Sequence, residues 1–256
     1  MILVKLGGSV ITDKSQYQML HHDVLVRLCE EIYDSGEDVI IVHGAGSFGH
    51  IMAHDHRIAE GYKYESQIKA LVTVSRDVRQ LNLEVLDAMI SAGISPVSLP
   101  PSACVVMRDR EIVEIDFDRI RSYLKLGISP VMFGDVALDE SQGFSICSGD
   151  QIMEALAREL LPKRVIFVSD IDGIMDRDPS DPGAALIGCV RPSDLEHMKF
   201  HAHVKDVTGG IKKKLAAMIG MIGPDRTCMI INGNVPGRLK AALRGDEVLG
   251  TKVELD

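Results

Sequence analysis

The sequence contains no tryptophan, and aromatic residues make up only 4% of its 256 residues. Proteins that bind single-stranded nucleic acid stack bases on aromatic side chains, so this scarcity argues against that class. The net charge of -9 also argues against a general nucleic-acid surface, because such surfaces are basic. An anion-binding site in this chain must therefore be local.

Paired cysteines are also missing. The chain has five single cysteines without a CxxC spacing, which is typical of reduced thiols and not of a disulfide framework or a zinc site. No apolar run approaches the ~20 residues that a membrane span needs, and the N-terminus lacks the apolar segment of a signal peptide. We therefore expect a cytoplasmic protein that does not associate with membranes.

Two familiar nucleotide-binding signatures are absent, the P-loop pattern GxxxxGK[ST] and the protein-kinase HRD motif. The segment Gly44–Gly49 matches the dinucleotide fingerprint GxGxxG. That fold also needs a second strand that ends in an acidic residue about 20 positions further on. The segment His50–Lys69 has no strand pattern, so Gly44–Gly49 is not a dinucleotide-binding fingerprint. A nucleotide that binds this chain must therefore be held by another kind of fold.

Hydrophobic residues are plentiful, at 46%, and they follow two periods. Short β-branched runs alternate with longer stretches of helical period, which predicts an α/β protein with a mostly parallel sheet and helices on both faces. The predicted strands are Ile2–Leu6, Asp38–His43, Ser95–Leu99, Ala103–Met107, Ile112–Ile115, Ile128–Phe133, Val136–Leu138, Val165–Ser169 and, as the final core strand, Thr227–Ile231. We expect Ala103–Met107 to pair with Ile112–Ile115, and Ile128–Phe133 to pair with Val136–Leu138. The predicted helices are Leu20–Ser35, Gln67–Ala92, Phe117–Leu126, one that runs from after Asp150 to about Leu160, and a last one after Gly210.

No internal repeat, low-complexity tract or long linker divides the chain. The best candidate for a boundary between two lobes lies near Gly143–Gly149. It separates an N-terminal lobe of residues 1–145 from a C-terminal lobe of residues 146–256. We expect one sheet to continue through both lobes.

Glycine-rich turns follow the first two predicted strands. The second strand runs into Gly44–Gly49 and then His50, and the first, with Lys5 near its end, runs into Gly7-Gly8-Ser9. Glycine lets backbone N–H groups approach an anion closely, and a following helix adds its positive end. A lysine beside such a turn is costly to bury without an anionic partner. We interpret both segments as phosphate sites, one for each of two reactants.

Three further segments place charged residues beside strands or helices. Ser148-Gly149-Asp150 begins a helix, and helix capping is the simplest role for Asp150. Asp170–Gly173 follows a strand, where ligands of open α/β sheets gather, although a β-turn would also explain it. A glycine pair ending at Gly210 precedes Lys212–Lys214, and cations at a helix N-terminus are unfavourable unless an anion offsets them. We infer that phosphates of a nucleotide lie there.

Together these parts suit phosphoryl transfer, in which catalysis consists mostly of positioning and of neutralising developing charge. No carboxylate stands out as a general base, which fits an acceptor that is already ionised at neutral pH, a carboxylate or a phosphate. The histidines within residues 50–56 and 197–203 have no HExxH spacing and no nearby cysteine, so we expect no metal-ligating residues.

Five motifs occur in an order typical of the amino-acid kinase superfamily. They are KLGGS at Lys5–Ser9, HGAGSFGH at His43–His50, SGD at Ser148–Asp150, SDIDGI at Ser169–Ile174 and DVTGGIKKK at Asp206–Lys214. Within that superfamily, the histidine that closes GSFGH and the lysine at position 14 resemble isopentenyl phosphate kinases, since members with carboxylate or carbamate acceptors generally lack that histidine. Proline often follows the histidine in that family, whereas this chain has Ile51.

The resemblance implies an open three-layer αβα sandwich, usually a homodimer. It implies that ATP and Mg²⁺ are used to convert isopentenyl phosphate to isopentenyl diphosphate by direct in-line transfer, in an alternative mevalonate pathway. The N-terminal lobe would take the acceptor and the C-terminal lobe the nucleotide. Residues 51–53 and 68–72 are candidates for the apolar pocket.

The resemblance also implies roles for individual residues. The residues implied for the nucleotide are Lys5, Gly7, Gly8, Ser9, Gly46, Asp170, Met175, Gly210 and Lys214. The residues implied for the acceptor are Ala45, Gly46, His50 and Gly149. The residues implied to be catalytic are Lys5, Lys14, His50, Asp150 and Lys214. Of these, Lys14 would neutralise the transferring group and Asp150 would orient the lysines.

Two alternatives stay open on the sequence. One is a small-molecule kinase of the same fold that acts on another phosphate, phosphonate or carboxylate. The other is a regulatory module that binds a nucleotide without transferring phosphate. The concentration of lysines around one predicted site favours a transferase, because simple binding does not need so many cations.

Overall fold

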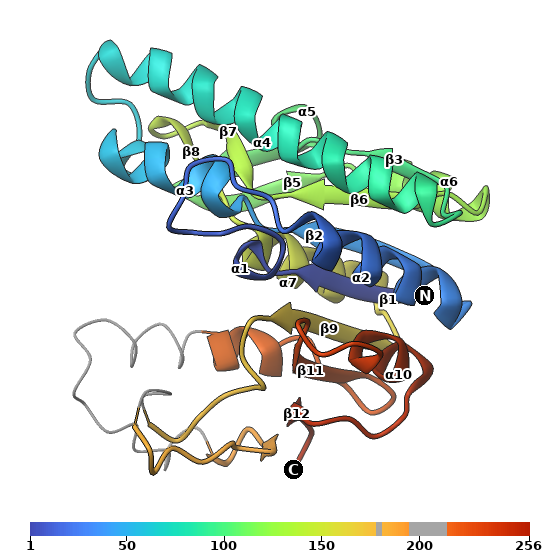
Figure 1. Cartoon of the computed structure of the whole chain (residues 1–256). Helices are drawn as coiled ribbons and strands as arrows, with labels where there is room; N and C mark the ends of the chain where they lie inside the picture. The colour runs from blue at the N-terminus through green and yellow to red at the C-terminus, as the bar shows by residue number, and fades with distance from the viewer. Residues whose placement is uncertain (178–180, 195–213) are drawn as a thin grey trace.

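The computed structural model describes residues 1–177, 181–194 and 214–256, and a mostly parallel sheet forms its centre (Figure 1). Its eight strands lie in the order β10 (Cys189–Val190), β12 (Gly250–Val253), β11 (Thr227–Asn232), β9 (Arg164–Ser169), β1 (Ile2–Leu6), β2 (Val39–His43), β6 (Ser129–Phe133) and β3 (Pro96–Ser98). Neighbouring strands are parallel except for β11 and β12. The predicted open, mostly parallel α/β fold is therefore confirmed.

The central strands are apolar throughout because both faces of the sheet are buried. Side chains alternate along each strand, so Ile2 and Val4 of β1 pack in one hydrophobic cluster and Leu3 packs in another. The same alternation separates Val165 from Ile166 in β9. Lys5 falls on the face of Leu3, in register with Phe167 of β9, and this places its ammonium at the carboxyl edge of the sheet.

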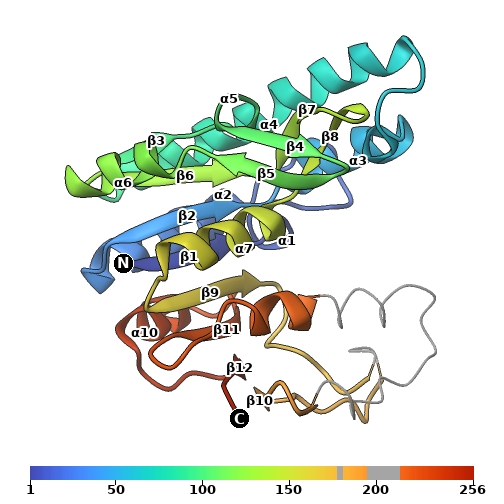
Figure 2. The ribbon, with the colours of Figure 1, turned by 180° about the vertical axis from the view of Figure 1, so that it is seen from behind.

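Helices cover both faces of the sheet. One face carries α2 (His22–Ser35), α4 (Ser66–Ser91) and α10 (Arg238–Arg244), and the other carries α6 (Phe117–Lys125), α7 (Gly149–Leu160) and the helical residues 214–219. Figure 1 shows α2 in front of β1 and β2, and the reverse view in Figure 2 shows α7 in front of them. Across the described parts of the chain, no helix is both long and apolar enough to cross a membrane.

A second sheet, which the sequence did not predict, packs beside the first. Its order is β5 (Glu111–Ile115), β4 (Val105–Arg108), β7 (Asp135–Asp139) and β8 (Gly143–Cys147). The predicted hairpin of β4 and β5 is confirmed. The predicted pairing of the next two strands is wrong, because β6 joins the large sheet while β7 pairs with β8 and β4. The chain changes sheets at Gly134, directly between the two strands.

Three further predictions need correction. The glycine-rich segment is not a turn up to His50, because α3 (Gly46–Asp55) begins at Gly46. A short helix, α1 (Gly8–Ile11), likewise begins inside the first glycine turn. The predicted last helix and final strand are not the last ones, since α10 and β12 follow them. These elements are short, and short elements carry a weak periodic signal.

Candidate active site

A cavity of about 570 Å³ lies at the carboxyl ends of β1, β2 and β9. Ligands of open α/β sheets bind at this edge, because loops and helix N-termini converge there. The cavity brings together most of the predicted site residues from both halves of the chain. Those that line it are Lys5, Gly7, Gly8, Ser9, Lys14, Ala45, His50, Gly149, Asp150, Asp170 and Lys214.

Three predicted residues do not line this cavity in the described structure. Gly46 borders a smaller hollow beside it, together with Lys14 and His50. Met175 forms an isolated backbone bridge with Leu186 and contributes nothing to the cavity wall. Gly210 lies outside the described residues.

The two glycine-rich segments are in direct contact. A Cβ atom on Gly8 would lie 2.7 Å from the backbone of Gly46, and one on Gly44 would lie 2.7 Å from the Gly8 nitrogen. Gly46 also has a φ of +51°, and a side chain there would collide with the Thr12 hydroxyl. Glycine is therefore required at these positions so that the first turn and the start of α3 can share one wall of the cavity.

Thr12 holds these segments together from behind. Its side chain is 1% exposed, and its hydroxyl donates to the Gly8 carbonyl at 2.6 Å and accepts from the Ser47 N–H at 3.0 Å. The Ser47 N–H is one of the first donors of α3, and Ala45, the residue that precedes this helix, supplies no side-chain cap. Thr12 thus caps α3 from another element, and it fixes the distance between the two segments.

Two backbone N–H groups face the space between the helices α3 and α7. They belong to Ala45 and Gly149, and neither has a hydrogen-bond partner among the described residues. A Cβ on Gly134 would lie 3.5 Å from the Gly149 nitrogen and 3.6 Å from the Ala45 nitrogen. Because Gly134 has no side chain, both donors stay open. Free N–H groups at the positive ends of two helices are suited to bind an anion.

Lysines from the two halves of the chain meet on the other side of the cavity. Lys5 Nζ lies 2.7 Å from an Asp150 carboxylate oxygen, and the Nζ atoms of Lys5 and Lys214 lie 5.8 Å and 5.7 Å from the centre of the Phe167 ring. Burial lowers the pKa of Lys214, against the opposing effect of Asp150. Lys5 is thus paired with Asp150, and Lys214 lies close enough to feel the charge of the same carboxylate.

Asp150 does not cap its helix, so the simplest interpretation of this residue is wrong. Ser148 accepts a hydrogen bond from the Gln151 N–H, and the Gln151 side chain accepts from the Ser148 N–H, a reciprocal capping box. Burial alone would raise the pKa of Asp150, but Lys5 and then Lys214 hold it below its usual range. The carboxylate is therefore ionised and available to orient both lysines.

His50 lies in the second turn of α3 and faces the cavity together with Lys14. Burial lowers the pKa of His50, and the positive charges of Lys14 and Lys5 lower it further. The imidazole of His50 is therefore neutral at pH 7 although it lies among cations. A bound phosphate would reverse the local charge and would be able to accept a hydrogen bond from this ring.

The two aspartates of the 170–173 loop have separate tasks. Asp170 lines the cavity and accepts a hydrogen bond from the Ser9 hydroxyl at 2.8 Å, which joins the two halves of the chain. Asp172 instead accepts from Arg238 at 2.5 Å and from Asn232 at 3.2 Å. Asp172 therefore anchors its loop to α10 and is not a residue of the cavity.

One end of the cavity is apolar. Its side chains come from α3, the short 3-10 helix η1 (Ile58–Glu60), α4 and β8, and they are Ala53, Ala59, Val74, Val78 and Ile146. Of the two segments predicted to form an apolar pocket, residues 51–53 contribute Ala53. The segment 68–72 contributes nothing, because Ile68 and Val72 are 45% and 59% exposed on α4.

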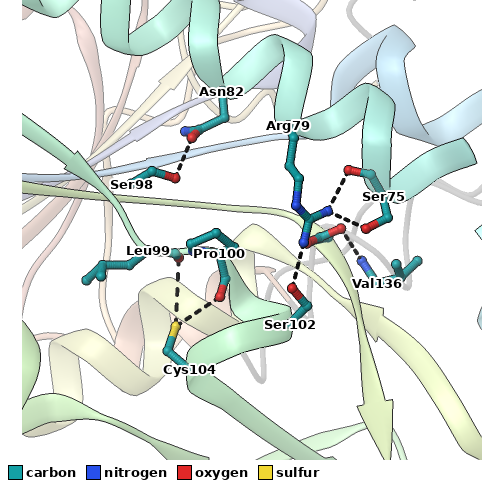
Figure 3. Close-up of polar contacts among 10 residues, drawn as sticks. Ser75, Arg79, Asn82, Ser98, Leu99, Pro100, Ser102, Cys104 and Val136 are labelled. Carbon is teal, nitrogen blue, oxygen red and sulfur yellow. Dashed lines mark hydrogen bonds and ion pairs between the residues drawn. The ribbon is translucent and has the colours of Figure 1, made fainter. Parts of the chain in front are cut away.

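Sequence reasoning missed Asp135, which also lines the cavity. It follows Gly134 and is 2% exposed, and Arg79 lies 3.2 Å from its Oδ2 atom. Figure 3 shows that Arg79, on α4, also bonds to Ser75 and Ser102. Burial raises the pKa of Asp135 to about 6, against the lowering effect of Arg79. A carboxylate two positions after a predicted buried strand was the available signal.

The described residues of the site form no dedicated metal cage. Among the described residues, no group of three or more His, Cys, Asp or Glu side chains is placed to hold a metal ion. The histidines at 197–203 lie outside those residues. This donor set fits Mg²⁺ only as an ion that arrives with a phosphorylated ligand, because Mg²⁺ often keeps water and phosphate oxygens as its main ligands.

The chain is similar to known proteins over most of its length. The amino acid kinase family matches residues 1–232. The isopentenyl phosphate kinase of Methanothermobacter thermautotrophicus is 38% identical over 263 residues, which covers 99% of this chain and 98% of the relative. That of Thermoplasma acidophilum is 37% identical over 242 residues, covering 93% and 94%. An X-ray structure of isopentenyl phosphate kinase superposes with a TM-score of 0.86 at 35% identity, covering 99% of this chain and 100% of that chain.

The chain therefore belongs to the amino acid kinase family, and the superfamily resemblance of its five motifs is confirmed. The match extends over nearly the full length of both proteins. Within that family, the chain is a member of the isopentenyl phosphate kinase group.

Proposed function

We propose that this protein transfers the γ-phosphoryl group of ATP to isopentenyl phosphate, forming isopentenyl diphosphate and ADP, in an alternative mevalonate pathway. One observation carries the proposal: the cavity combines two open helix N-termini and several lysines with an apolar end lined by residues such as Val74 and Ile146. An acceptor with a phosphate head and a short hydrocarbon tail matches both ends. A carboxylate acceptor such as an amino acid would leave the apolar end unused.

On the acceptor side, the phosphate would lie between the N–H groups of Ala45 and Gly149, with His50 as a further donor. In the transfer step, an acceptor oxygen forms a bond to the γ-phosphorus while the bond from that phosphorus to the β–γ bridging oxygen breaks. ADP leaves with the electron pair of that bond. No base is needed because the acceptor oxygen is already ionised.

On the nucleotide side, Lys5 and Lys214 would neutralise charge that develops on the transferring group and on the leaving ADP. Lys14 would act on the same group from the loop after α1, and Asp150 would orient Lys5 and Lys214. The turn of Gly7, Gly8 and Ser9 would contact the phosphates of ATP. Mg²⁺, when bound with ATP, would neutralise part of the phosphate charge.

The finer assignments rest on the family resemblance. Residues 1–145 would bind the acceptor and residues 146–256 the nucleotide, with Met175 and Gly210 in the nucleotide site and Gly46 between the reactants. The homodimer and the cytoplasmic location stay predictions. The related kinase with another acceptor and the non-catalytic module are not favoured, because the relatives that match over nearly the whole chain are named isopentenyl phosphate kinase.

A coupled assay of ADP release with ATP and Mg²⁺ tests the proposal. The acceptors are isopentenyl phosphate, a short alkyl phosphonate, inorganic phosphate and N-acetylglutamate. We expect turnover with isopentenyl phosphate that exceeds all others by at least about tenfold in kcat/KM, because only this acceptor fills both ends of the cavity. Equal turnover of inorganic phosphate, or ATP binding without any ADP release, would contradict the proposal.

A further inference from the structure

His43 ends β2 directly before the glycine-rich segment, and no step of the proposed reaction uses it. Its side chain is fully buried, and it stacks on Phe133 with ring centroids 5.2 Å apart. Burial lowers the pKa of His43 to about 4, so the ring is neutral at pH 7. A neutral imidazole has one N–H donor and one acceptor, and its neighbours determine which nitrogen has which role.

Three polar groups determine the tautomer of His43. Its Nδ1 atom lies 3.1 Å from the Gly44 carbonyl oxygen, which can only accept, so Nδ1 carries the proton. Its Nε2 atom then accepts from Asn82 Nδ2 at 3.1 Å. Asn82 in turn accepts a hydrogen bond from the Ser98 hydroxyl at 2.5 Å, and Figure 3 shows these two residues facing each other from α4 and β3. We refer to Ser98, Asn82 and His43 as the buried relay.

The relay ends on the peptide group that carries one of the open donors. The Gly44 carbonyl and the Ala45 N–H belong to the same trans peptide, so they point in opposite directions. A hydrogen bond that holds the carbonyl on one side therefore sets the direction of the N–H on the other. Gly44 has no side chain that could hold this peptide by packing, and a Cβ there would lie 2.7 Å from the Gly8 nitrogen.

We propose that His43, held by Asn82 and Ser98, is a positioning residue that aims the Ala45 N–H at the phosphate of the acceptor. This inference rests on the proposed function, because it assigns the acceptor phosphate to that N–H group. His43 touches neither reactant. It acts through one peptide group, so its effect is confined to the acceptor and spares the nucleotide.

Steady-state kinetics of His43→Leu test the inference. Without the Nδ1–H donor, the peptide can rotate away from the phosphate, and kcat/KM for isopentenyl phosphate falls about 10- to 100-fold while KM for ATP changes less than about twofold. His43→Asn is the matched control, because its amide nitrogen can donate near the position of Nδ1. We expect this variant to recover most of the lost kcat/KM.

The remote members of the buried relay supply an independent test if His43→Leu does not fold. Asn82→Leu and Ser98→Ala leave His43 in place but remove its support, and we expect the acceptor kcat/KM to fall more in Asn82→Leu than in Ser98→Ala, again with KM for ATP unchanged. An acceptor kcat/KM within twofold of wild type in folded His43→Leu and Asn82→Leu would overturn the inference, as would an equal rise in KM for ATP. Absence of wild-type turnover with isopentenyl phosphate would instead overturn the proposed function, and the inference with it.

Discussion

The two walls of the cavity bind through different kinds of atoms. The amide wall, formed by Ala45, Gly134 and Gly149, presents the backbone N–H groups of Ala45 and Gly149. The side-chain wall, formed by Phe167, Asp170 and Lys214, presents an aromatic ring and charged groups. A backbone donor cannot be removed by an ordinary substitution, whereas a side chain can. The residues that control the amide wall therefore lie behind it, at Thr12 and in the buried relay.

The largest effect on kcat is expected for His50, whose side chain adds a donor to those of the amide wall. In His50→Ala the acceptor phosphate loses a donor that approaches it during transfer, and we expect kcat to fall about 10²- to 10³-fold. ADP release with isopentenyl phosphate measures this effect. His22→Ala is the control, because that histidine is 69% exposed and outside the cavity. Unchanged turnover of His50→Ala would remove His50 from the mechanism.

A smaller loss of about 100-fold in kcat is expected for Lys214→Ala on the side-chain wall. The ammonium that it removes would stabilise charge only as the phosphoryl group moves, so KM for the acceptor should change by less than about threefold. Initial rates over a grid of ATP and acceptor concentrations separate the two constants. If the acceptor KM rose while kcat stayed constant, Lys214 would belong to the acceptor and the contrast between the walls would fail.

Thr12→Val tests whether support from behind the amide wall matters. The substitution keeps the shape of the side chain and leaves the Ser47 N–H without its partner, whereas the Gly8 carbonyl keeps the backbone N–H of Thr12 and loses only the hydroxyl. We expect the free energy of unfolding to fall by about 1–3 kcal/mol and kcat to fall about tenfold, because the distance between the two glycine-rich segments is no longer fixed. Urea unfolding and kinetics measure the two effects. Thr12→Ser keeps the hydroxyl, so it should resemble wild type in both.

The smallest effect on turnover is expected at Asp135, whose influence is on stability. Its pKa in the folded protein is about 6, above the ordinary value of 3.8. Between these values the unfolded chain releases a proton that the folded protein keeps, so stability is lost as pH rises from about 4 to 6, by up to about 3 kcal/mol. Asp135→Asn should lack this loss.

Unfolding of both proteins at pH 4.5, 6 and 7.5 checks this prediction. The difference between them isolates Asp135, because all other titrating groups are shared. Parallel curves for the two proteins over this range would show that Asp135 does not titrate as its burial implies.

The sequence predicted features that depend on neighbours along the chain. Buried strands such as Ile2–Leu6, the end of α2 at a left-handed Gly36 and the glycine turns beside Lys5 and His50 all follow from local patterns. The change of sheet at Gly134 does not, because the partner of a strand is determined by packing across the whole fold. For the same reason β7 was assigned the wrong partner.

The hydrogen bonds that hold the amide wall from behind could not be predicted from the sequence for a similar reason. Thr12 and Ser47 are 35 positions apart, and Asn82 and His43 are 39 positions apart. No local spacing connects such residues, and each alone is typical of an ordinary buried polar residue. Asp150 shows the same limit. Its helix was predicted, but its ion pair with Lys5 could not be, because that contact depends on how α7 packs against β1.

The most direct test of the acceptor site is the response of the Ala45 and Gly149 amides to isopentenyl phosphate in the absence of ATP. In ¹H–¹⁵N spectra of the full chain, we expect both amide proton resonances to move downfield on titration, since hydrogen bonds to an ionised phosphate are strong. In His43→Leu the Ala45 shift should be smaller and the Gly149 shift retained. Saturable binding that leaves both resonances unmoved would contradict the assignment of the acceptor phosphate to the amide wall.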